Sequence, residues 1–134
     1  MHHSFIQRPG ERKESMNKRK IGTEYENLAA RYLESKGLRI LESNFRCRLG
    51  EIDLIAKDHS VIVFFEVKYR SSEAMGVPQE AVDHRKQTRI CKVADYYRMT
   101  HHLGEFTPFR FDVISICDHH MIWIPNAFPY QSRK

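Results

Sequence analysis

The first part of the chain carries apolar residues at helical spacing between residues 21 and 36. Such a stripe predicts an amphipathic helix whose apolar side faces a core. The members of the stripe are Tyr25, Leu28, Ala29, Tyr32 and Leu33. Thr23 is a candidate N-terminal cap, and Gly37 follows the last turn, where a glycine commonly ends a helix.

A different pattern follows, in which short runs of β-branched and aromatic residues are separated by polar turns. The runs at 38–46, 51–57 and 61–70 predict three strands, and VIVFFEVKYR at 61–70 carries the strongest signal. The short turns between these runs predict an antiparallel meander. A long helix over 79–99 and two strands over 109–117 and 121–125 are predicted next.

The predicted element order is therefore α-β-β-β-α-β-β. The third strand, the long helix and the fourth strand form a crossover, which should be right-handed and should make these two strands parallel. The continuous apolar run VIVFF is typical of a central strand that is buried on both faces. The sequence thus predicts an α/β fold with a mixed sheet and helices on both faces.

The length of 134 residues suits one domain. Residues 1–20 are expected to form a basic, disordered tail, residues 21–126 the domain, and residues 127–134 an irregular C-terminal tail. The first tail holds six Lys and Arg against two Glu, so it carries +4 of the net charge of +5. This excess is weak support for a polyanionic partner, and Met16 is an equally good start of the chain.

The surroundings of the protein are indicated by what the sequence lacks. No apolar run approaches the roughly 18 residues of a membrane span, and the N-terminus lacks a secretion signal. The three cysteines are widely spaced and do not form a disulfide pattern. These features predict a cytoplasmic protein without a membrane partner.

The strand at 61–70 places charges where a central strand usually has none. Alternation puts on one face Ile62, Phe64, Glu66, Lys68 and Arg70. Buried charges are costly unless they are paired or bind a metal, so this face is the first place to look for function. An ordinary salt bridge between Glu66 and Lys68 is the alternative, and an E-x-K triplet alone favours it.

A second acid, Asp53, lies on the preceding strand across a tight turn from Glu66. A loop of two or four residues would set the two acids directly opposite, with Cβ atoms roughly 5 Å apart, whereas an odd loop would offset them. Two carboxylates this close repel each other unless a proton or a cation lies between them. Because Mg²⁺ prefers such oxygen ligands, Asp53 and Glu66 are predicted metal ligands, and Lys68 is placed to assist at a phosphate.

Two helical residues are further candidates. Lys86 interrupts the stripe by which the long helix packs on the sheet, an arrangement that a snorkelling lysine explains equally well. Glu26 borders the apolar stripe of the first helix, although the pattern alone favours a solvent-exposed position for it. Arg110 and Asp112 share one face of the fourth strand and are expected to pair with each other.

Taken together, these motifs resemble the bacterial YraN-like family, a group of predicted nucleases. The resemblance covers roughly residues 21–123 and rests on Tyr25-Glu26 with LAARYL at 28–33, Gly50-Glu51-Ile52-Asp53, Phe65-Glu66-Val67-Lys68 with Arg70, the stretch from Gly76 and Pro78 to Lys86, and Arg110-Phe111-Asp112-Val113. The family is similar to the PD-(D/E)xK nuclease superfamily and to archaeal Holliday-junction resolvases. Two positions depart from that pattern: Ile52 replaces the proline of the superfamily's name, and Tyr25 replaces the glycine usual before the helix glutamate.

The resemblance implies a restriction-endonuclease-like, three-layer α/β/α fold and a nuclease that uses Mg²⁺ or Mn²⁺. It implies Asp53 and Glu66 as metal ligands, Lys68 as the catalytic lysine and Glu26 as an accessory acid. Gln79 and Lys86 fall where such proteins place a helper residue. The candidate contacts to nucleic acid are Arg70, Lys86 and, in the tail, Lys18, Arg19 and Lys20.

The leading hypothesis is therefore an endonuclease that hydrolyses phosphodiester bonds in DNA, with branched or damaged DNA as candidate substrates. A second hypothesis is a nucleic-acid-binding module that keeps the fold but has little activity. A third is an RNA-processing nuclease with the same site. Junction-cutting relatives act as dimers, which is consistent with a homodimer here.

Overall fold

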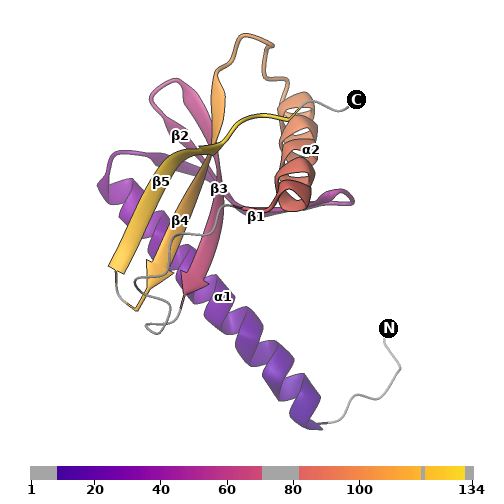
Figure 1. The fold of residues 1–134 in the computed structure, drawn as a ribbon, viewed down its shortest axis with the longest axis vertical. Helices are drawn as coiled ribbons and strands as arrows, with labels where there is room; N and C mark the ends of the chain where they lie inside the picture. Colours follow the sequence, from indigo (N-terminus) through magenta and orange to yellow (C-terminus); the bar gives the residue numbers. More distant parts are fainter. Residues whose placement is uncertain (1–8, 71–81, 119, 132–134) are drawn as a thin grey trace.

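The structure, a computed structural model, describes residues 9–70, 82–118 and 120–131, with residues 9–21 described by their backbone alone. Its elements follow the predicted order (Figure 1): α1 (Pro9–Ser35), β1 (Arg39–Cys47), β2 (Gly50–Asp58), β3 (Val61–Arg70), α2 (His84–Thr100), β4 (Phe109–Cys117) and β5 (His120–Phe128). Over the described ranges, no helix combines the length and the apolarity that a membrane crossing requires.

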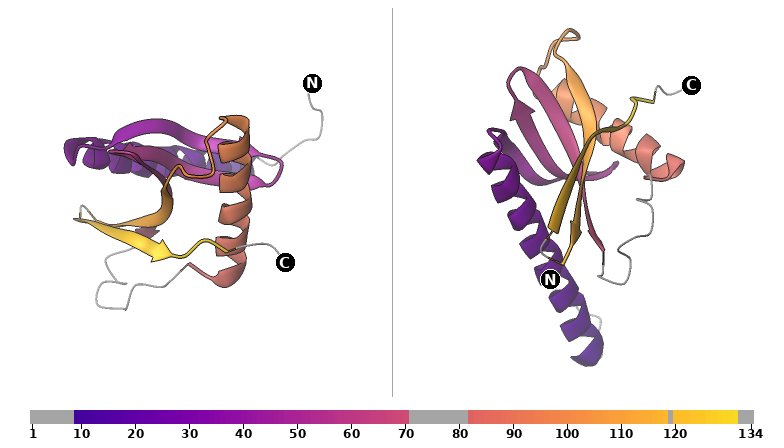
Figure 2. Two further views of the ribbon diagram at one scale, coloured as in Figure 1. Left: turned by 90° about the horizontal axis from the view of Figure 1, so that it is seen from above. Right: turned by 60° about the vertical axis from the view of Figure 1, so that its left-hand side comes forward.

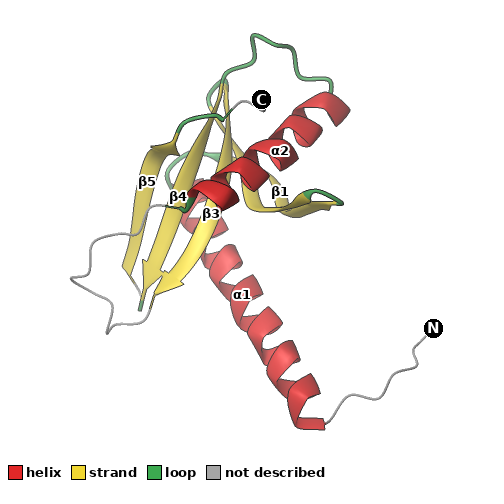
Figure 3. Cartoon of the chain, turned by 45° about the vertical axis from the view of Figure 1, so that its right-hand side comes forward, coloured by secondary structure: helices red, strands yellow, loops and turns green. Residues whose placement is uncertain are grey.

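The first helix starts earlier than its apolar stripe indicates. α1 begins at Pro9 rather than at residue 21, so part of the segment expected to be a disordered tail is helical. Thr23 consequently lies inside the helix and does not cap it. The N-terminal half of α1 projects beyond the sheet (Figure 1 and Figure 3). Residues 1–8 lie outside the described ranges.

The end of α1 confirms the prediction at Gly37. This residue has φ +95°, a conformation that glycine adopts without strain. The N–H of Leu38 donates to the carbonyl of Leu33 at 3.1 Å, which is the bond of a glycine-terminated helix end. The chain therefore turns sharply from α1 into β1.

The strands form one five-stranded mixed sheet in the order β1-β2-β3-β4-β5. β1, β2 and β3 form an antiparallel meander and β3 and β4 are parallel, as predicted, and β4 and β5 are antiparallel. Asp58 pairs with Val61, so the turn between β2 and β3 consists of His59 and Ser60, with His59 at φ +57°. This two-residue turn sets the register of the acids on β2 and β3.

Two further boundaries differ from the prediction. α2 begins at His84 rather than at residue 79, because Asp83 caps it and accepts the N–H of Lys86 at 2.9 Å. β5 runs to Phe128 instead of ending at residue 125, so it passes the predicted end of the domain at residue 126. Phe128 stacks on Phe111 of β4 at a centroid distance of 5.0 Å, and this buried contact extends the strand.

The two helices lie on opposite sides of the sheet (Figure 2, right). Ala29 and Leu33 of α1 are fully buried in one cluster with Val63 and Phe65 of β3. On the other face, Ile62 and Phe64 pack with the buried side of α2. The predicted alternation along β3 is thus confirmed, whereas Leu28, expected on the buried stripe of α1, is 41% exposed.

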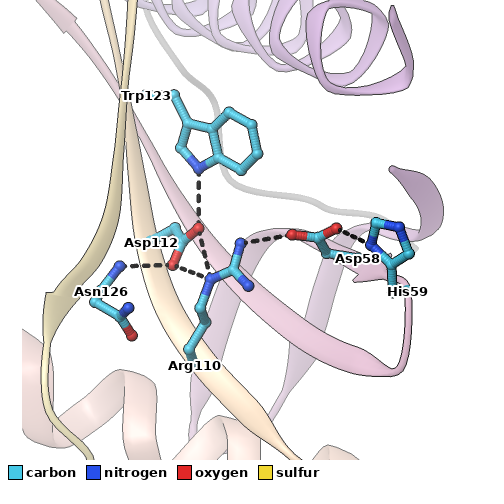
Figure 4. Close-up of polar contacts among 6 residues, drawn as sticks. All are labelled: Asp58, His59, Arg110, Asp112, Trp123 and Asn126. Atoms are coloured by element: carbon cyan, nitrogen blue, oxygen red, sulfur yellow. Dashed lines mark hydrogen bonds and ion pairs between the residues drawn. The ribbon is translucent and has the colours of Figure 1, made fainter. Parts of the chain in front are cut away.

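A buried acid on β4 ties the sheet together (Figure 4). Asp112 is fully buried, and Arg110 donates to both of its carboxylate oxygens at 3.1 and 3.2 Å, which confirms the expected pair. The indole of Trp123 and the backbone N–H of Asn126 complete its hydrogen bonds at 2.9 and 3.0 Å. Arg110 also donates to Asp58 at 3.1 Å. The Arg110–Asp112 motif is therefore structural, because it joins β4, β5 and the β2–β3 turn.

Candidate functional site

β2 and β3 part where Asp53 and Glu66 face each other. The last pair of their antiparallel ladder is Leu54 with Phe65, and the same register brings Asp53 opposite Glu66. Asp53 Oδ2 accepts a hydrogen bond from the backbone N–H of Val67 at 2.8 Å. This N–H of β3 is therefore paired with a side chain of β2. The register is the directly opposed one that a two-residue turn was predicted to give.

Asp53 lies in an environment that disfavours its charge. Burial raises its pKa to about 7, and the negative charge of Glu66 adds to the rise. The hydrogen bond from Val67 opposes it, while Glu26 and Glu51 raise the pKa further. Burial and neighbouring like charges are the two causes that shift a carboxyl pKa upward. A cation or a proton at this position would relieve the repulsion.

Glu66 is buried and receives its counter-charge from α2. Its exposed fraction is 8%, and its Oε2 forms an ion pair with Nζ of Lys86. Lys86 therefore interrupts the apolar side of α2, as the sequence indicated, in order to reach an acid on the sheet. Val82 and Ile90, four residues before and after Lys86, belong to the buried cluster that packs on this face of the sheet.

Glu26 approaches the same place from the other helix. Burial raises the pKa of its carboxyl group, and hydrogen bonding with the side chains of Asn44 and Asp53 opposes that rise. Glu26 is half-buried, so the exposed position favoured by the pattern alone is wrong. The ring of Tyr25 stacks on Tyr69 of β3 at a centroid distance of 4.3 Å. A large residue before the helix glutamate is thus accommodated beside the sheet.

The remaining predicted residues are less closely tied to the acids. Lys68 lies two residues beyond Glu66 on the same face of β3 and is half-buried, and Arg70 ends that strand. The ion pair described for Glu66 is with Lys86, on α2. Gln79 lies outside the described residues. The tail residues fall in the part of α1 whose side chains are not described: Lys18, Arg19 and Lys20.

A pocket of about 560 Å³ opens beside Asp53 and Glu66. Its lining includes three residues that sequence reasoning missed, namely Arg46, Glu51 and Arg89. Arg46 and Glu51 form a weak, exposed ion pair at 3.9 Å across the β1–β2 hairpin. Arg89 follows Lys86 by three residues, so the two side chains are neighbours on the surface of α2. This spacing is the one feature of the sequence that could have indicated Arg89 as a pocket residue.

Gly50 allows α2 to approach the β1–β2 hairpin. It has φ +143°, and a Cβ atom there would lie 3.2 Å from the side chain of Arg89 and 3.3 Å from Val93. A larger residue would therefore push against the helix that carries Lys86 and Arg89. The glycine of the Gly50-Glu51-Ile52-Asp53 motif thus shapes the wall of the pocket.

The donor set suits a hard divalent cation. Asp53 and Glu66 supply carboxylate oxygens, and across the described residues there is no group of three or more His, Cys, Asp and Glu placed to hold a metal. A structural zinc site needs four ligands, usually thiolate or imidazole. Mg²⁺ binds through one or two carboxylates together with water and substrate phosphate. The residues present therefore fit Mg²⁺ or Mn²⁺.

Fold and site together define a mixed α/β protein with paired carboxylates in a pocket that three cationic side chains also line. The model described as "Uncharacterised protein family UPF0102" matches residues 25–116, which extend from Tyr25 into β4. The chain belongs to the UPF0102 family, the YraN-like group that its motifs resemble.

Relatives in other bacteria match most of the chain. A UPF0102 protein of Lachnoclostridium phytofermentans is 46% identical over 113 residues, which are 84% of this chain and 96% of the relative. A UPF0102 protein of Alkaliphilus oremlandii is 52% identical over 102 residues, 75% of this chain and 86% of the relative. A UPF0102 protein of Caldanaerobacter subterraneus is 48% identical over 101 residues, which are 75% of this chain and 82% of the relative.

Proposed function

We propose that this protein is a Mg²⁺- or Mn²⁺-dependent endonuclease that hydrolyses phosphodiester bonds in DNA, on a restriction-endonuclease-like arrangement of sheet and helices. The observation that carries the proposal is the opposition of Asp53 and Glu66 where β2 and β3 part. Buried like charges are kept in a fold at a cost in stability, which is characteristic of functional sites. The pocket that contains these acids is also lined by Arg46, Lys86 and Arg89, whose charges suit a phosphate.

In this proposal Asp53 and Glu66 hold the divalent cation. When bound, that cation activates a water molecule and neutralises charge that develops on the phosphate. Val67 fixes the orientation of Asp53 by donating its N–H to Oδ2. Glu26 positions Asp53 from the α1 side through the hydrogen bond between their side chains, and burial raises the pKa of the Glu26 carboxyl group.

The cationic residues act on the phosphate. Lys86 neutralises Glu66 before substrate binds, and it lies in the pocket with Arg46 and Arg89. A phosphate that enters the pocket attracts all three side chains, and developing negative charge is stabilised by cations already in place. Lys68, the catalytic lysine by resemblance, lies one pleat farther along β3, on the face of Glu66.

One observation favours the second candidate, a binding module without activity. The ion pair between Lys86 and Glu66 already satisfies one of the two predicted metal ligands. A protein that only binds nucleic acid would retain this pair as a structural contact. Cleavage by the wild type therefore has to be tested directly.

The decisive experiment is a cleavage assay with labelled single-stranded DNA, duplex DNA, a four-way DNA junction and RNA, each with Mg²⁺, Mn²⁺ or EDTA. Asp53→Asn and Glu66→Gln keep the shape of the site and remove its charge. Glu34→Gln, on the exposed side of α1, is the matched control. We expect metal-dependent products from the wild type and Glu34→Gln, and a loss of at least a hundredfold in the two site variants.

Three other outcomes are informative. Products from RNA alone would replace DNA by RNA as the substrate. If the protein binds nucleic acid but yields no cleavage products with either metal ion, the second candidate, a binding module without activity, would be established. Products that persist in Asp53→Asn would place the chemistry elsewhere and overturn the proposed site.

A further inference from the structure

A second hollow of about 470 Å³ adjoins the acid pocket. Its lining consists of Arg48, Leu49, Arg85, Thr88, Arg89 and Lys92. Arg89 lines both hollows, so they are neighbours at this side chain. The second hollow contains four cationic residues and no acidic one.

The cations of α2 lie on one stripe of the helix. Arg85, Arg89, Lys92 and Tyr96 are spaced by four, three and four residues, which is the spacing of one helix face. The core-facing residues of α2 occupy the other side, among them Ile90, Val93, Ala94 and Tyr97. This cationic stripe is therefore not required for packing on the sheet.

A third hollow of about 270 Å³ continues the second one and is less polar. It shares Arg48, Leu49 and Lys92 with its neighbour, and it adds Tyr96 and Met99. Leu49 is 39% exposed at the tip of the β1–β2 hairpin, and Met99 is 67% exposed on α2. The acid at this end, Asp95, is engaged by Arg98 at 3.4 Å and by the hydroxyl of Tyr130 at 2.9 Å.

The second and third hollows form one groove between the β1–β2 hairpin and α2, which we call the α2 groove. It is lined chiefly by Arg48, Leu49, Arg85, Arg89, Lys92 and Tyr96. From Lys86 to Tyr96 the helix rises about 15 Å, a length that several consecutive phosphates of one strand span. The groove thus leads away from the acids, with cations near them and apolar surface at the far end.

We propose that the α2 groove binds a single-stranded segment of nucleic acid next to the bond that is cut, which rests on the proposed function. Cations spaced along a helix match successive phosphates. The apolar end, with Leu49 and Tyr96, suits the face of an unpaired base, which a duplex keeps stacked inside. An acidic protein segment would match the cations but not this apolar end.

The test uses the full chain in EDTA, so that binding is measured without cleavage. Affinities for labelled single-stranded DNA, single-stranded RNA, duplex DNA and a poly-glutamate peptide are measured by fluorescence anisotropy at several salt concentrations. The groove variant is Arg48→Gln with Lys92→Gln. The control is Arg31→Gln with Lys57→Gln, which removes the same charge from exposed positions on α1 and β2.

We expect the groove variant to bind single strands about 10- to 30-fold more weakly at 0.1 M salt, because each cation that pairs with a phosphate contributes roughly fivefold there. Its log–log salt slope should fall by about 1.4, since each neutralised phosphate of a single strand contributes about 0.7. The control should stay within twofold of the wild type. Leu49→Ser should weaken single-strand binding and leave the salt slope unchanged, because it removes no charge.

The outcomes separate the groove from the cleavage site. Equal reductions in the groove and control variants, unchanged binding by the groove variant, or stronger binding of duplex or peptide than of single strands would each overturn the groove assignment. If the groove variant behaves as expected but the wild type cuts nothing, the groove stands and the endonuclease proposal falls. If the wild type cuts and the groove variant binds normally, the endonuclease proposal stands and the groove assignment falls.

Discussion

The carboxylate of Asp53 accepts the backbone N–H of Val67 at 2.8 Å, and this bond marks the place where β2 and β3 part. A donor of the central strand is satisfied by a side chain, so the sheet opens without leaving that group unpaired. The opening lets Asp53 meet Glu66 from the α2 side and Glu26 from the α1 side, and both acids raise its pKa. The site therefore lies within the sheet, between the two helices.

The first prediction concerns pH and Asp53. Because its folded pKa of about 7 exceeds the ordinary value of 3.8, the native state binds the proton more tightly than the unfolded chain. The metal-free free energy of unfolding should therefore decline as pH rises from about 4 to 7. Asp53→Asn should remove this part of the decline, and near pH 8 it should match or exceed the wild type by about 1 kcal/mol.

Urea titrations of both proteins in EDTA, at several pH values, check this expectation. The comparison between the two proteins cancels the contribution of the histidines. An asparagine can still accept the N–H of Val67, so the hydrogen bond is retained. A variant less stable by about 3 kcal/mol would instead show that Asp53 is the structural partner of a buried cation.

The second prediction uses Asp112 as a contrast. This acid is fully buried and accepts bonds from Arg110, Trp123 and Asn126. Asp112→Asn leaves the guanidinium of Arg110 with a weaker partner and cannot accept every donor. This substitution should lower the free energy of unfolding by about 3 kcal/mol at pH 7, as expected when a buried ion pair loses one charge. A cost below about 0.5 kcal/mol in the same urea titration would contradict the structural role.

The third prediction concerns Lys86 and metal affinity. Lys86 forms an ion pair with Glu66, so it competes with a cation for that carboxylate. Lys86→Met should tighten Mg²⁺ binding by roughly three- to tenfold, equivalent to about 0.7–1.4 kcal/mol. Cleavage should nevertheless fall, because the variant has one cation fewer at the phosphate.

Calorimetric titration with Mg²⁺ measures the affinity, and melting temperature against Mg²⁺ concentration provides an independent measure. Lys92→Met is the matched control, since it lies on the same helix but outside the acid pocket. Weaker Mg²⁺ binding in Lys86→Met than in the control would show that the lysine supports the metal site instead of competing for it.

The fourth prediction concerns the basic N-terminal segment. The core contacts described for α1 begin near Tyr25, and the N-terminal half of the helix projects beyond the sheet. Deleting residues 1–20 should therefore change the free energy of unfolding by less than about 0.5 kcal/mol. If this segment binds DNA, the salt slope of duplex binding should fall by about 0.9 for each phosphate that the segment neutralises. An unchanged slope would assign duplex binding to the folded body alone.

Local patterns in the sequence were sufficient for much of this fold. The alternation along 61–70 predicted which residues of β3 face each helix, because successive side chains of a strand point to opposite faces. The polar residues Asp58-His59-Ser60 predicted the hairpin that brings Asp53 and Glu66 onto neighbouring strands. Whether the two acids stand directly opposite depended on the length of the loop, which the structure gives as two residues. Both features depend on residues close in sequence, where geometry leaves few choices.

Helix boundaries were predicted less well. The apolar stripe of α1 begins near residue 21, but the helix begins at Pro9, so it extends beyond the residues that form the stripe. α2 begins at His84 because the side chain of Asp83 caps it, and β5 runs on to Phe128 because that ring stacks on Phe111. Such endings depend on single contacts that a periodic pattern does not contain.

The sequence by itself determined the order of the elements, the two faces of β3 and the placing of Asp53 and Glu66 on neighbouring strands. Only the tertiary structure decided that Lys86 pairs with Glu66, that Glu26 reaches Asp53, and that Arg46, Arg48, Arg89 and Lys92 line two neighbouring hollows. The physical reason is distance along the chain. These contacts depend on how α1, α2 and the β1–β2 hairpin pack on the sheet, and that packing is set by burial over the whole fold, which is non-directional and leaves no local signal.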